Sequence, residues 1–205
     1  MTEETYIGSA KNENLSSAKK AKNDEFYTQF SDINAECCHY KEQFKGKTVF
    51  LNCDDPIESN FWMYFYKNFI FFGMKCLIST HFDKDNPTYA LVLTEDKDYR
   101  FPEGVGDLTK QKETTFEDIT EDGKTIRLYR IKLPLKQNGD FRSDECVALL
   151  KSSDIVCTNP PFSLFREYVA QLIQYEKEFL IIGNMNAITY KEIFPLLKDN
   201  KMWIG

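Results

Sequence analysis

The sequence has no apolar run of the roughly 18 residues that a membrane-spanning helix needs. Its densest apolar stretch, residues 61–72, is interrupted by Lys67 and Asn68. Residues 1–10 include acidic side chains and no apolar core, unlike a secretory signal peptide. These absences predict a cytoplasmic protein that has no membrane partner.

Positive charge is also scarce, and the cysteines lack a metal-binding spacing. The formal net charge of −6 disfavours a small protein that binds nucleic acid through bulk charge. Binding to nucleic acid through a local patch, or through a segment outside this chain, is still an open alternative. None of the six cysteines forms a C-x-x-C pair, and Cys37-Cys38-His39 is not followed by a second pair of ligands. We therefore expect free thiols and no metal site.

The composition that is present fits one domain with a substantial core, because 42% of the 205 residues are hydrophobic and 28% are charged. Residues 1–22 are polar and show no hydrophobic period, which predicts a flexible tail. A small basic arm near DNA phosphates is the alternative interpretation. Residues 23–205 are expected to form the folded catalytic domain, with an insertion at about 82–135.

The folded part alternates between strand-like and helical patterns. Short apolar runs at 48–53, 75–80, 154–158 and 179–183 predict strands, and the helical patterns between them predict an α/β sheet with helices on both faces. Within the insertion, runs at 89–94 and 126–133 predict an antiparallel hairpin. Helices are expected within 24–44 after a cap at Ser31 or Asp32, at 61–72 and 144–151, and after caps at Ser163 and Thr189. Residues 202–205 look like the start of another strand.

The most distinctive motif is Asn159-Pro160-Pro161-Phe162, which follows directly after a predicted buried strand. Two prolines have fixed φ angles and disfavour helix in the residue before them, so they make a stiff turn that aims backbone carbonyls outward. The Asn159 side-chain oxygen and the Pro160 carbonyl could accept the two hydrogens of an amino group on an aromatic ring. Phe162 could stack on that ring. Such a turn at the carboxyl end of a strand favours a functional site over a plain bend.

Four segments in this order resemble the adenine-specific DNA methyltransferases of the EcoRI type, which use S-adenosylmethionine. The segments are Asn23-Asp24-Glu25-Phe26-Tyr27-Thr28-Gln29, Asn52-Cys53-Asp54-Asp55-Pro56, Gly139-Asp140-Phe141-Arg142-Ser143 and Thr158-Asn159-Pro160-Pro161-Phe162. The resemblance covers most of residues 22–205 and is weakest in the insertion. It implies a Rossmann-like sheet and methyl transfer to the N6 amino group of an adenine flipped out of double-stranded DNA, in a restriction-modification setting.

The resemblance also implies roles for single residues. Asn159 and the Pro160 carbonyl would hold the target amino group, and Phe162 would stack on the base. Asp140 would accept a hydrogen bond from the adenine of S-adenosylmethionine, with Phe141 packed nearby. The methionine end of the cofactor would lie by Tyr27 and Thr28, and the loop after the first strand would contribute Asp54, Asp55 and Pro56.

The loop after the first strand departs from the usual pattern, because Ile57-Glu58-Ser59-Asn60-Phe61 contains no glycine. Cofactor binding through the N–H groups at the start of the following helix is the expected substitute. Asp54 and Asp55 also fit a second interpretation as caps or turn formers, and Gly139-Asp140 also fits a plain turn.

The chain is expected to lack the last strands of a full methyltransferase sheet and a C-terminal target-recognition region. A partner chain or a missing C-terminal region would then supply target recognition.

Two other functions stay open on the residues alone. One is methylation of a glutamine side chain or of an RNA adenine, since the same turn accepts any planar amino group. The other is a catalytically weak or inactive module that keeps the fold and binds the cofactor or a partner.

Overall fold

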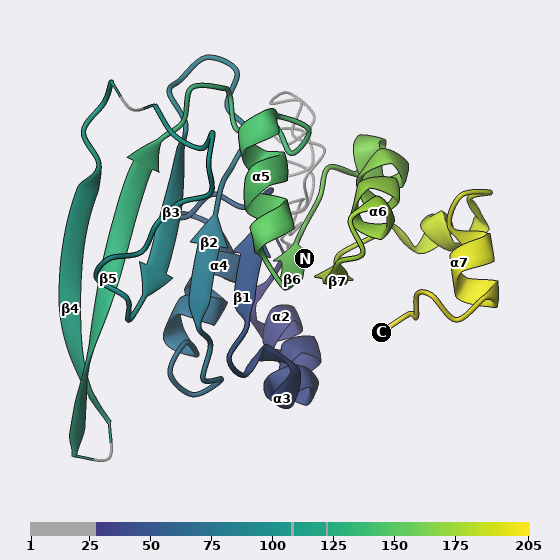
Figure 1. The fold of residues 1–205 in the computed structure, drawn as a ribbon. Coiled ribbons are helices and arrows are strands. Elements are labelled where there is room, and N and C mark those ends of the chain that lie inside the picture. Colours follow the sequence, from purple (N-terminus) through teal and green to yellow (C-terminus); the bar gives the residue numbers. More distant parts are fainter. Residues whose placement is uncertain (1–27, 108, 122) are drawn as a thin grey trace, which may run out of the picture.

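A seven-stranded mixed sheet forms the centre of the molecule (Figure 1). The computed structural model describes residues 28–107, 109–121 and 123–205, so the predicted tail and Tyr27 lie outside the described residues. The strand order is β4-β5-β3-β2-β1-β6-β7. The strands are β1 (Thr48–Leu51), β2 (Cys76–Ser79), β3 (Tyr89–Thr94), β4 (Glu113–Glu121), β5 (Lys124–Pro134), β6 (Ile155–Thr158) and β7 (Glu178–Ile181).

Four of these strands run parallel, and they are the four that the short apolar runs predict. β1 lies between β2 and β6, with Phe50 opposite both Ile78 and Val156, and β7 pairs with the outer side of β6. Because parallel strands end at the same edge of a sheet, the loops that follow β1, β2, β6 and β7 lie along one edge. Three of the four segments that carry the family resemblance reach this carboxyl edge.

Helices cover both faces of the sheet, as the α/β pattern predicts. Val49 and Leu51 of β1 point into a core formed with α2 and α4, whereas Phe50 points into a second core with α5 and α6. This alternation follows from the two-residue period of a strand. The helices are α2 (Phe30–Cys37), α3 (Lys41–Phe44), α4 (Asn60–Lys67), α5 (Asp144–Ser152), α6 (Phe165–Gln174) and α7 (Phe194–Lys198), with 3-10 turns η1 (Cys38–Tyr40), η2 (Phe162–Leu164) and η3 (Met185–Thr189).

The insertion is antiparallel, as predicted, and it adds three strands to one side of the sheet. The two predicted strands correspond to β3 and β5, and Val92 of β3 lies opposite Ile131 of β5. The sequence pattern missed β4, the long outer strand, because most of its described side chains are exposed and show no apolar face. Cross-strand ion pairs connect it to β5, including Asp118 with Arg127 at 2.6 Å.

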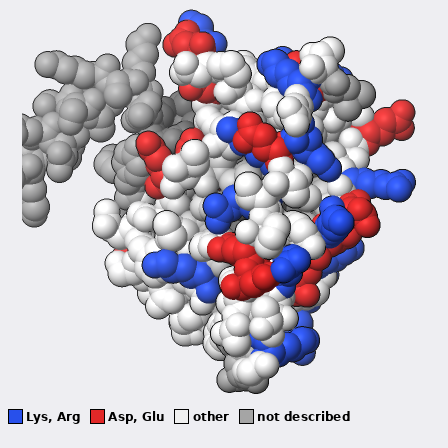
Figure 2. All heavy atoms as spheres, turned by 90° about the vertical axis from the view of Figure 1, so that its left-hand side faces the viewer, with Lys and Arg blue, Asp and Glu red and all other residues white. Residues whose placement is uncertain are grey.

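The outer face of this antiparallel arm carries both signs of charge. Figure 2 views the molecule from the β4 side and shows Lys and Arg interspersed with Asp and Glu. Glu117 lies 3.6 Å from Arg130, and the Arg127 guanidinium stacks over the Phe116 ring at 4.3 Å. Mixed charge of this kind gives no broad positive field, in line with the net charge of the chain.

Three expected helix caps are wrong. Gln29 precedes α2, so Ser31 and Asp32 lie inside that helix. Ser163 lies inside the turn η2, and Leu164 precedes the first residue of α6 without a side-chain cap, because the Pro161 carbonyl accepts the Leu164 N–H and closes a tighter turn first. The hydroxyl of Thr189 donates back to the Asn186 carbonyl instead of opening a helix. Residues 202–205 form no strand. In the part of the chain that the structure describes, no helix combines the length and the apolar character needed to cross a bilayer.

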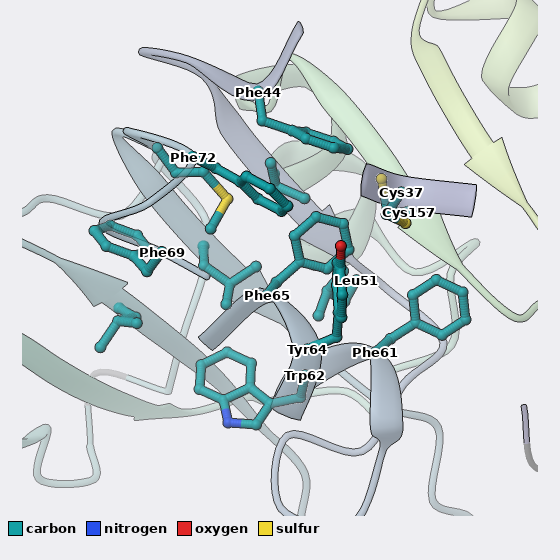
Figure 3. Close-up of a cluster of buried hydrophobic side chains, with 14 of the residues drawn as sticks. Cys37, Phe44, Leu51, Phe61, Trp62, Tyr64, Phe65, Phe69, Phe72 and Cys157 are labelled. Carbon is teal, nitrogen blue, oxygen red and sulfur yellow. The ribbon is translucent and has the colours of Figure 1, made fainter. Parts of the chain in front are cut away.

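An aromatic cluster between α3, α4 and the sheet forms the largest part of the first core (Figure 3). Ser59 accepts the N–H groups of Phe61 and Trp62 and so begins α4. The Phe65 ring then meets Phe44 edge to face at 5.1 Å, and Phe44 stacks on Phe72 at 5.4 Å. The position of α4, and hence of the loop before it, depends on this packing.

Replacement of Phe65 by alanine should lower the free energy of unfolding by about 3–5 kcal/mol, because Phe65 is fully buried and its loss leaves a cavity. Urea unfolding followed by circular dichroism measures the change. Phe116→Ala is the matched control, since the Phe116 ring is 60% exposed and its loss should cost less than about 1 kcal/mol. Equal losses for the two variants would contradict this account of the core.

Candidate active site at the carboxyl edge of the sheet

The buried carboxylate of Asp54 connects the loop after β1 to the end of β6. Its Oδ2 accepts the Thr158 hydroxyl in a short hydrogen bond and lies 3.4 Å from the Asn159 backbone nitrogen, which also donates to it. Its Oδ1 accepts the Ser59 hydroxyl at 2.8 Å. Since Ser59 also caps α4, a single carboxylate joins the end of β6, the loop after β1 and the first turn of α4.

Burial raises the pKa of Asp54 to about 6, and the hydrogen bonds from Thr158, Ser59 and Asn159 lower that pKa only in part. A carboxylate in this position is costly to ionise, because it has left water for a site of low polarity. Its three donors lie on two segments of the chain, the end of β6 and the start of α4. Asp54 therefore positions the segments that meet here.

The Asn-Pro-Pro-Phe bend starts at this contact and lies beside the tip of β1. Asn159 and Pro160 are buried, whereas Pro161 and Phe162 are half-buried. The Pro161 carbonyl accepts the Leu164 N–H at 3.0 Å, which turns the chain into α6. The structure thus brings the bend and the loop after β1 to one place at the carboxyl edge.

Asp55 forms the turn that follows Asp54. Its Oδ1 accepts the N–H groups of Ile57 at 2.7 Å and Glu58 at 2.9 Å, and its Oδ2 lies 3.6 Å from Nε2 of His81. Pro56, within the turn, is buried. These contacts agree with the interpretation of Asp55 as a turn former.

The backbone N–H groups around the start of α4 are therefore engaged within the chain. Asp55 holds two of them, and the Ser59 hydroxyl holds those of Phe61 and Trp62. The expectation that these donors are free for a cofactor carboxylate is not met at those four positions. The acidic and hydroxyl side chains accept hydrogen bonds from the backbone N–H groups of this tight turn before α4, so the turn forms without glycine.

Thr28 lies beside the first residue of α4. Its carbonyl accepts a hydrogen bond from the Asn60 side-chain amide at 2.8 Å, across 32 residues of sequence. The structure thus brings the segment before α2 next to the loop after β1. The neighbouring residue of the predicted pair, Tyr27, lies outside the described residues.

Asp140 and Phe141 come to the same edge from the loop before α5. Gly139 has a φ of +74°, and a Cβ at this position would lie 2.0 Å from the His81 carbonyl oxygen, so only glycine fits between the two loops. Asp140 accepts three hydrogen bonds from Arg142, from its backbone N–H, Nε and a terminal nitrogen, and these keep the pKa of Asp140 below its usual range.

Phe141 belongs to a chain of contacts that the sequence analysis missed. Its buried ring meets the Tyr168 ring of α6 edge to face at 5.1 Å, and the Tyr168 hydroxyl donates a short hydrogen bond to Oδ1 of Asn52 at the end of β1. The Nδ2 of Asn52 is buried and has no hydrogen-bond partner among the described residues. The only sign of these contacts in the sequence was Tyr168 on the apolar side of α6, and a tyrosine in such a position is typical of an ordinary core residue.

Comparison with known proteins finds a family match across nearly the whole chain. The model of the family described as adenine-specific methyltransferase EcoRI matches residues 14–205. The chain is 46% identical over 198 residues to a type II methyltransferase, M.EcoRI, from Escherichia coli, with 96% of this chain and 56% of that protein covered. It is 41% identical over 188 residues to M.MpnI from Mycoplasma pneumoniae, with 92% and 49% covered. The chain therefore spans about half the length of the curated relatives it matches. No solved structure matches it.

Replacement of Asp54 by asparagine should flatten the dependence of stability on pH. A carboxyl whose pKa rises from 3.8 to about 6 on folding adds stability that is full below pH 3.8 and is lost as pH rises through 6. The wild-type chain should lose up to roughly 3 kcal/mol relative to Asp54→Asn between pH 4 and pH 7. Urea unfolding across this range measures the difference, and Asp55→Asn is the neighbouring control. Parallel stability curves for wild type and Asp54→Asn would contradict the account.

Proposed function

The chain belongs to the family of adenine-specific methyltransferases of the EcoRI type, and from this premise we propose that it forms the catalytic part of a DNA adenine-N6 methyltransferase. The observation that carries the proposal is the position of the Asn-Pro-Pro-Phe bend. It lies at the carboxyl edge of the sheet, where Thr158 and the Asn159 N–H bond to the buried Asp54 beside the tip of β1. A restriction-modification setting follows from the type II names of its relatives.

The bend supplies hydrogen-bond acceptors for an amino group. In the proposed complex, the Asn159 side-chain oxygen and the Pro160 carbonyl accept the two hydrogens on N6 of adenine. The lone pair on N6 is then less delocalised into the ring and can attack a methyl carbon. Phe162 stacks on the base, and one of the two held protons leaves to water after the transfer. Alignment by this rigid bend provides the main gain in rate.

S-adenosylmethionine, when bound, supplies a methyl group on a positively charged sulfur, so the reaction needs no general base with a tuned pKa. The residues at the edge fit such a molecule. The buried Nδ2 of Asn52 lacks a partner among the described residues and offers a donor. Asp140 is partly exposed and offers an acceptor, because a carboxylate has about four lone-pair directions and Arg142 uses three of them. We assign the adenine end of the cofactor to Asp140 and Phe141, and the methionine end to Tyr27, Thr28 and the loop 54–56.

Double-stranded DNA is the proposed substrate, and its target adenine must leave the base stack at a cost of a few kcal/mol. The arm formed by β3, β4 and β5 carries mixed charge, so bulk attraction to phosphates is not the source of binding on that face (Figure 2). Target recognition is proposed to come from protein outside these 205 residues, either a partner chain or a further region comparable to the unmatched half of the relatives.

Methyl transfer gives the direct test. Incubation with S-adenosylmethionine labelled on the methyl group and unmethylated duplex DNA should label adenine. Asn159→Ala should lower the rate on the order of 100-fold, because one prearranged hydrogen-bonding group is lost, while cofactor affinity stays within about threefold.

Asn68→Ala is the matched control, since its amide caps the far end of α4 by donating to the Tyr64 carbonyl. It should leave the rate unchanged. Label in RNA or in a glutamine peptide instead of DNA would change the substrate class. No label in any of them, at high protein concentration and low salt, would favour an inactive module.

Cofactor affinity tests the role of Asp140. Calorimetry with S-adenosylmethionine should give a Kd about tenfold weaker for Asp140→Ala than for wild type, since an acceptor for the cofactor adenine is lost. Asp118→Ala is a close control, because Asp118 also forms a two-point pair with an arginine, Arg127, on the distant hairpin. If both substitutions changed the Kd equally, Asp140 would have no specific role in binding.

A further inference from the structure

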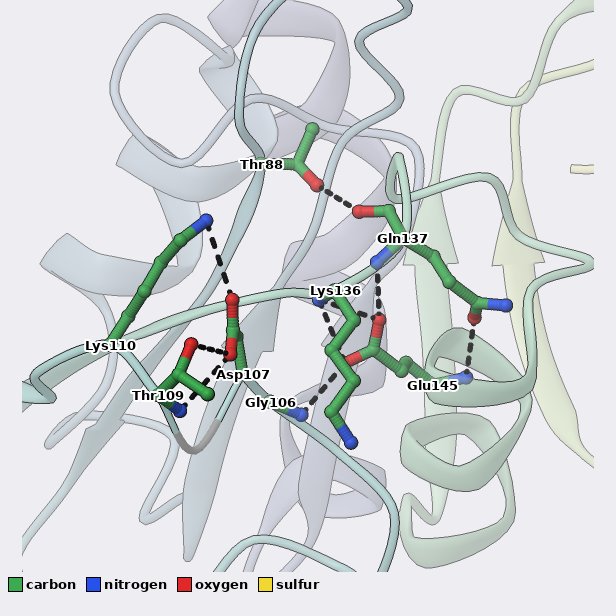
Figure 4. Close-up of polar contacts among 8 residues, drawn as sticks. All are labelled: Thr88, Gly106, Asp107, Thr109, Lys110, Lys136, Gln137 and Glu145. Carbon is green, nitrogen blue, oxygen red and sulfur yellow. Dashed lines mark hydrogen bonds and ion pairs between the residues drawn. The ribbon is translucent and has the colours of Figure 1, made fainter.

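A second buried carboxylate, that of Glu145, lies against Lys136 and Gln137, at the start of the loop that leads to Asp140, and Figure 4 shows its contacts with these two residues. Glu145 is in the first turn of α5 and is 3% exposed. Its Oε1 accepts the Gly106 N–H at 2.7 Å, and its Oε2 accepts those of Lys136 at 3.0 Å and Gln137 at 2.8 Å. Each of the three partners is a backbone N–H, so the contact fixes the path of the main chain.

Two of these donors belong to the strap, which we define as residues 136–142 between β5 and α5. Other contacts hold the strap from the opposite side. The Thr88 hydroxyl donates to the Gln137 carbonyl at 2.9 Å, and the Asp83 N–H donates to the Asn138 carbonyl at 3.0 Å. Gly139 then packs against the His81 carbonyl. The strap thus reaches Asp140 with its backbone bonded to α5 on one side and to the segment around β3 on the other.

The third donor, Gly106, ties the inserted segment to the same carboxylate. Gly106 has a φ of +91°, and a Cβ there would lie 2.3 Å from a methyl carbon of Leu133. The next residue, Asp107, donates its N–H to the Pro134 carbonyl at 2.7 Å, and its side chain holds the following turn through Thr109. The loop before β4 is therefore pressed onto the end of β5 with one N–H directed at Glu145. Through this contact the insertion helps to hold Glu145, and through Glu145 the strap, in place.

We propose that Glu145 is a positioning residue that holds the strap, and with it Asp140 and Phe141, in the geometry that binds the adenosine end of the methyl donor. The inference rests on the proposed function. A carboxylate suits this place because it only accepts hydrogen bonds, and its partners are three donors. A glutamine of the same shape would direct an NH₂ group at one or more of these N–H groups and leave them without an acceptor. The strap would then open more often, without any change to the cofactor-facing side chains.

The test compares Glu145→Gln with Asp154→Asn. Asp154 also uses a carboxylate to bind a backbone N–H, that of Thr48 at 2.7 Å, but at the opposite edge of the sheet. Hydrogen exchange of the backbone amides, followed by mass spectrometry or NMR, reports opening of the strap without any ligand. Calorimetry with S-adenosylmethionine then gives the Kd of each variant.

In Glu145→Gln, exchange at Lys136 and Gln137 should be at least tenfold faster and the Kd about tenfold weaker, with the methyl-transfer rate at saturating cofactor within about threefold of wild type. Asp154→Asn should change neither strap exchange nor Kd. Strap exchange that stays at the wild-type rate in Glu145→Gln, or faster exchange with an unchanged Kd, would overturn the inference.

Should Glu145→Gln fail to fold, Glu145→Asp decides the matter. It keeps the charge but shortens the reach to Gly106, so it should weaken the Kd at least threefold, and a wild-type Kd would overturn the role. A wild-type chain that binds no S-adenosylmethionine at all would refute the proposed function itself, and the positioning role would fall with it. The ligand-free exchange data would still show separately whether Glu145 holds the strap.

Discussion

The arrangement of the carboxyl edge depends on one interaction, the hydrogen bonding of the buried Asp54 carboxylate to Thr158, Asn159 and Ser59. It joins the end of β6 to the loop after β1 at the point where the Cys53 N–H also donates to the Thr158 hydroxyl, at 3.2 Å. Burial makes this carboxylate costly to ionise, which its raised pKa records. This desolvation cost falls at the place where the proposed chemistry needs the loops after β1 and β6 in a fixed relative position.

Glu145 fixes the position of the strap in the way that Asp54 fixes the loop after β1. Both carboxylates are buried, and both accept from donors on segments far apart in the sequence. Such contacts contribute little to net stability compared with apolar packing, since desolvation offsets much of their gain. Their contribution is geometric, because they select one path for loops that apolar side chains do not hold. The aromatic core beneath α4 supplies the stability, and the carboxylates set the positions at the edge.

The loop after β1 shows how a glycine-poor sequence forms a tight turn beside a helix. Asp55 and Ser59 accept the N–H groups of the turn and of the first helical residues. In the proposed complex a cofactor cannot use these N–H groups, which makes the strap and the segment at Thr28 more important than the helix start. The antiparallel arm, which has no catalytic residues in the proposal, contributes through the Gly106 contact to Glu145.

The order of residues is enough to predict the α/β class, the four parallel strands, the two strands of the insertion that have an apolar side, and the bend at Asn159–Phe162. Each of these depends on local pattern or on fixed proline geometry, which neighbouring residues reveal. The folded molecule was needed to show that β4 extends the sheet, since an exposed edge strand is stabilised by partners on β5 and has no apolar face of its own. It alone brought Asn52 to Tyr168 and Glu145 to Gly106. Such contacts join residues 39 to 116 positions apart, and no local pattern records which distant donor a buried acceptor will meet.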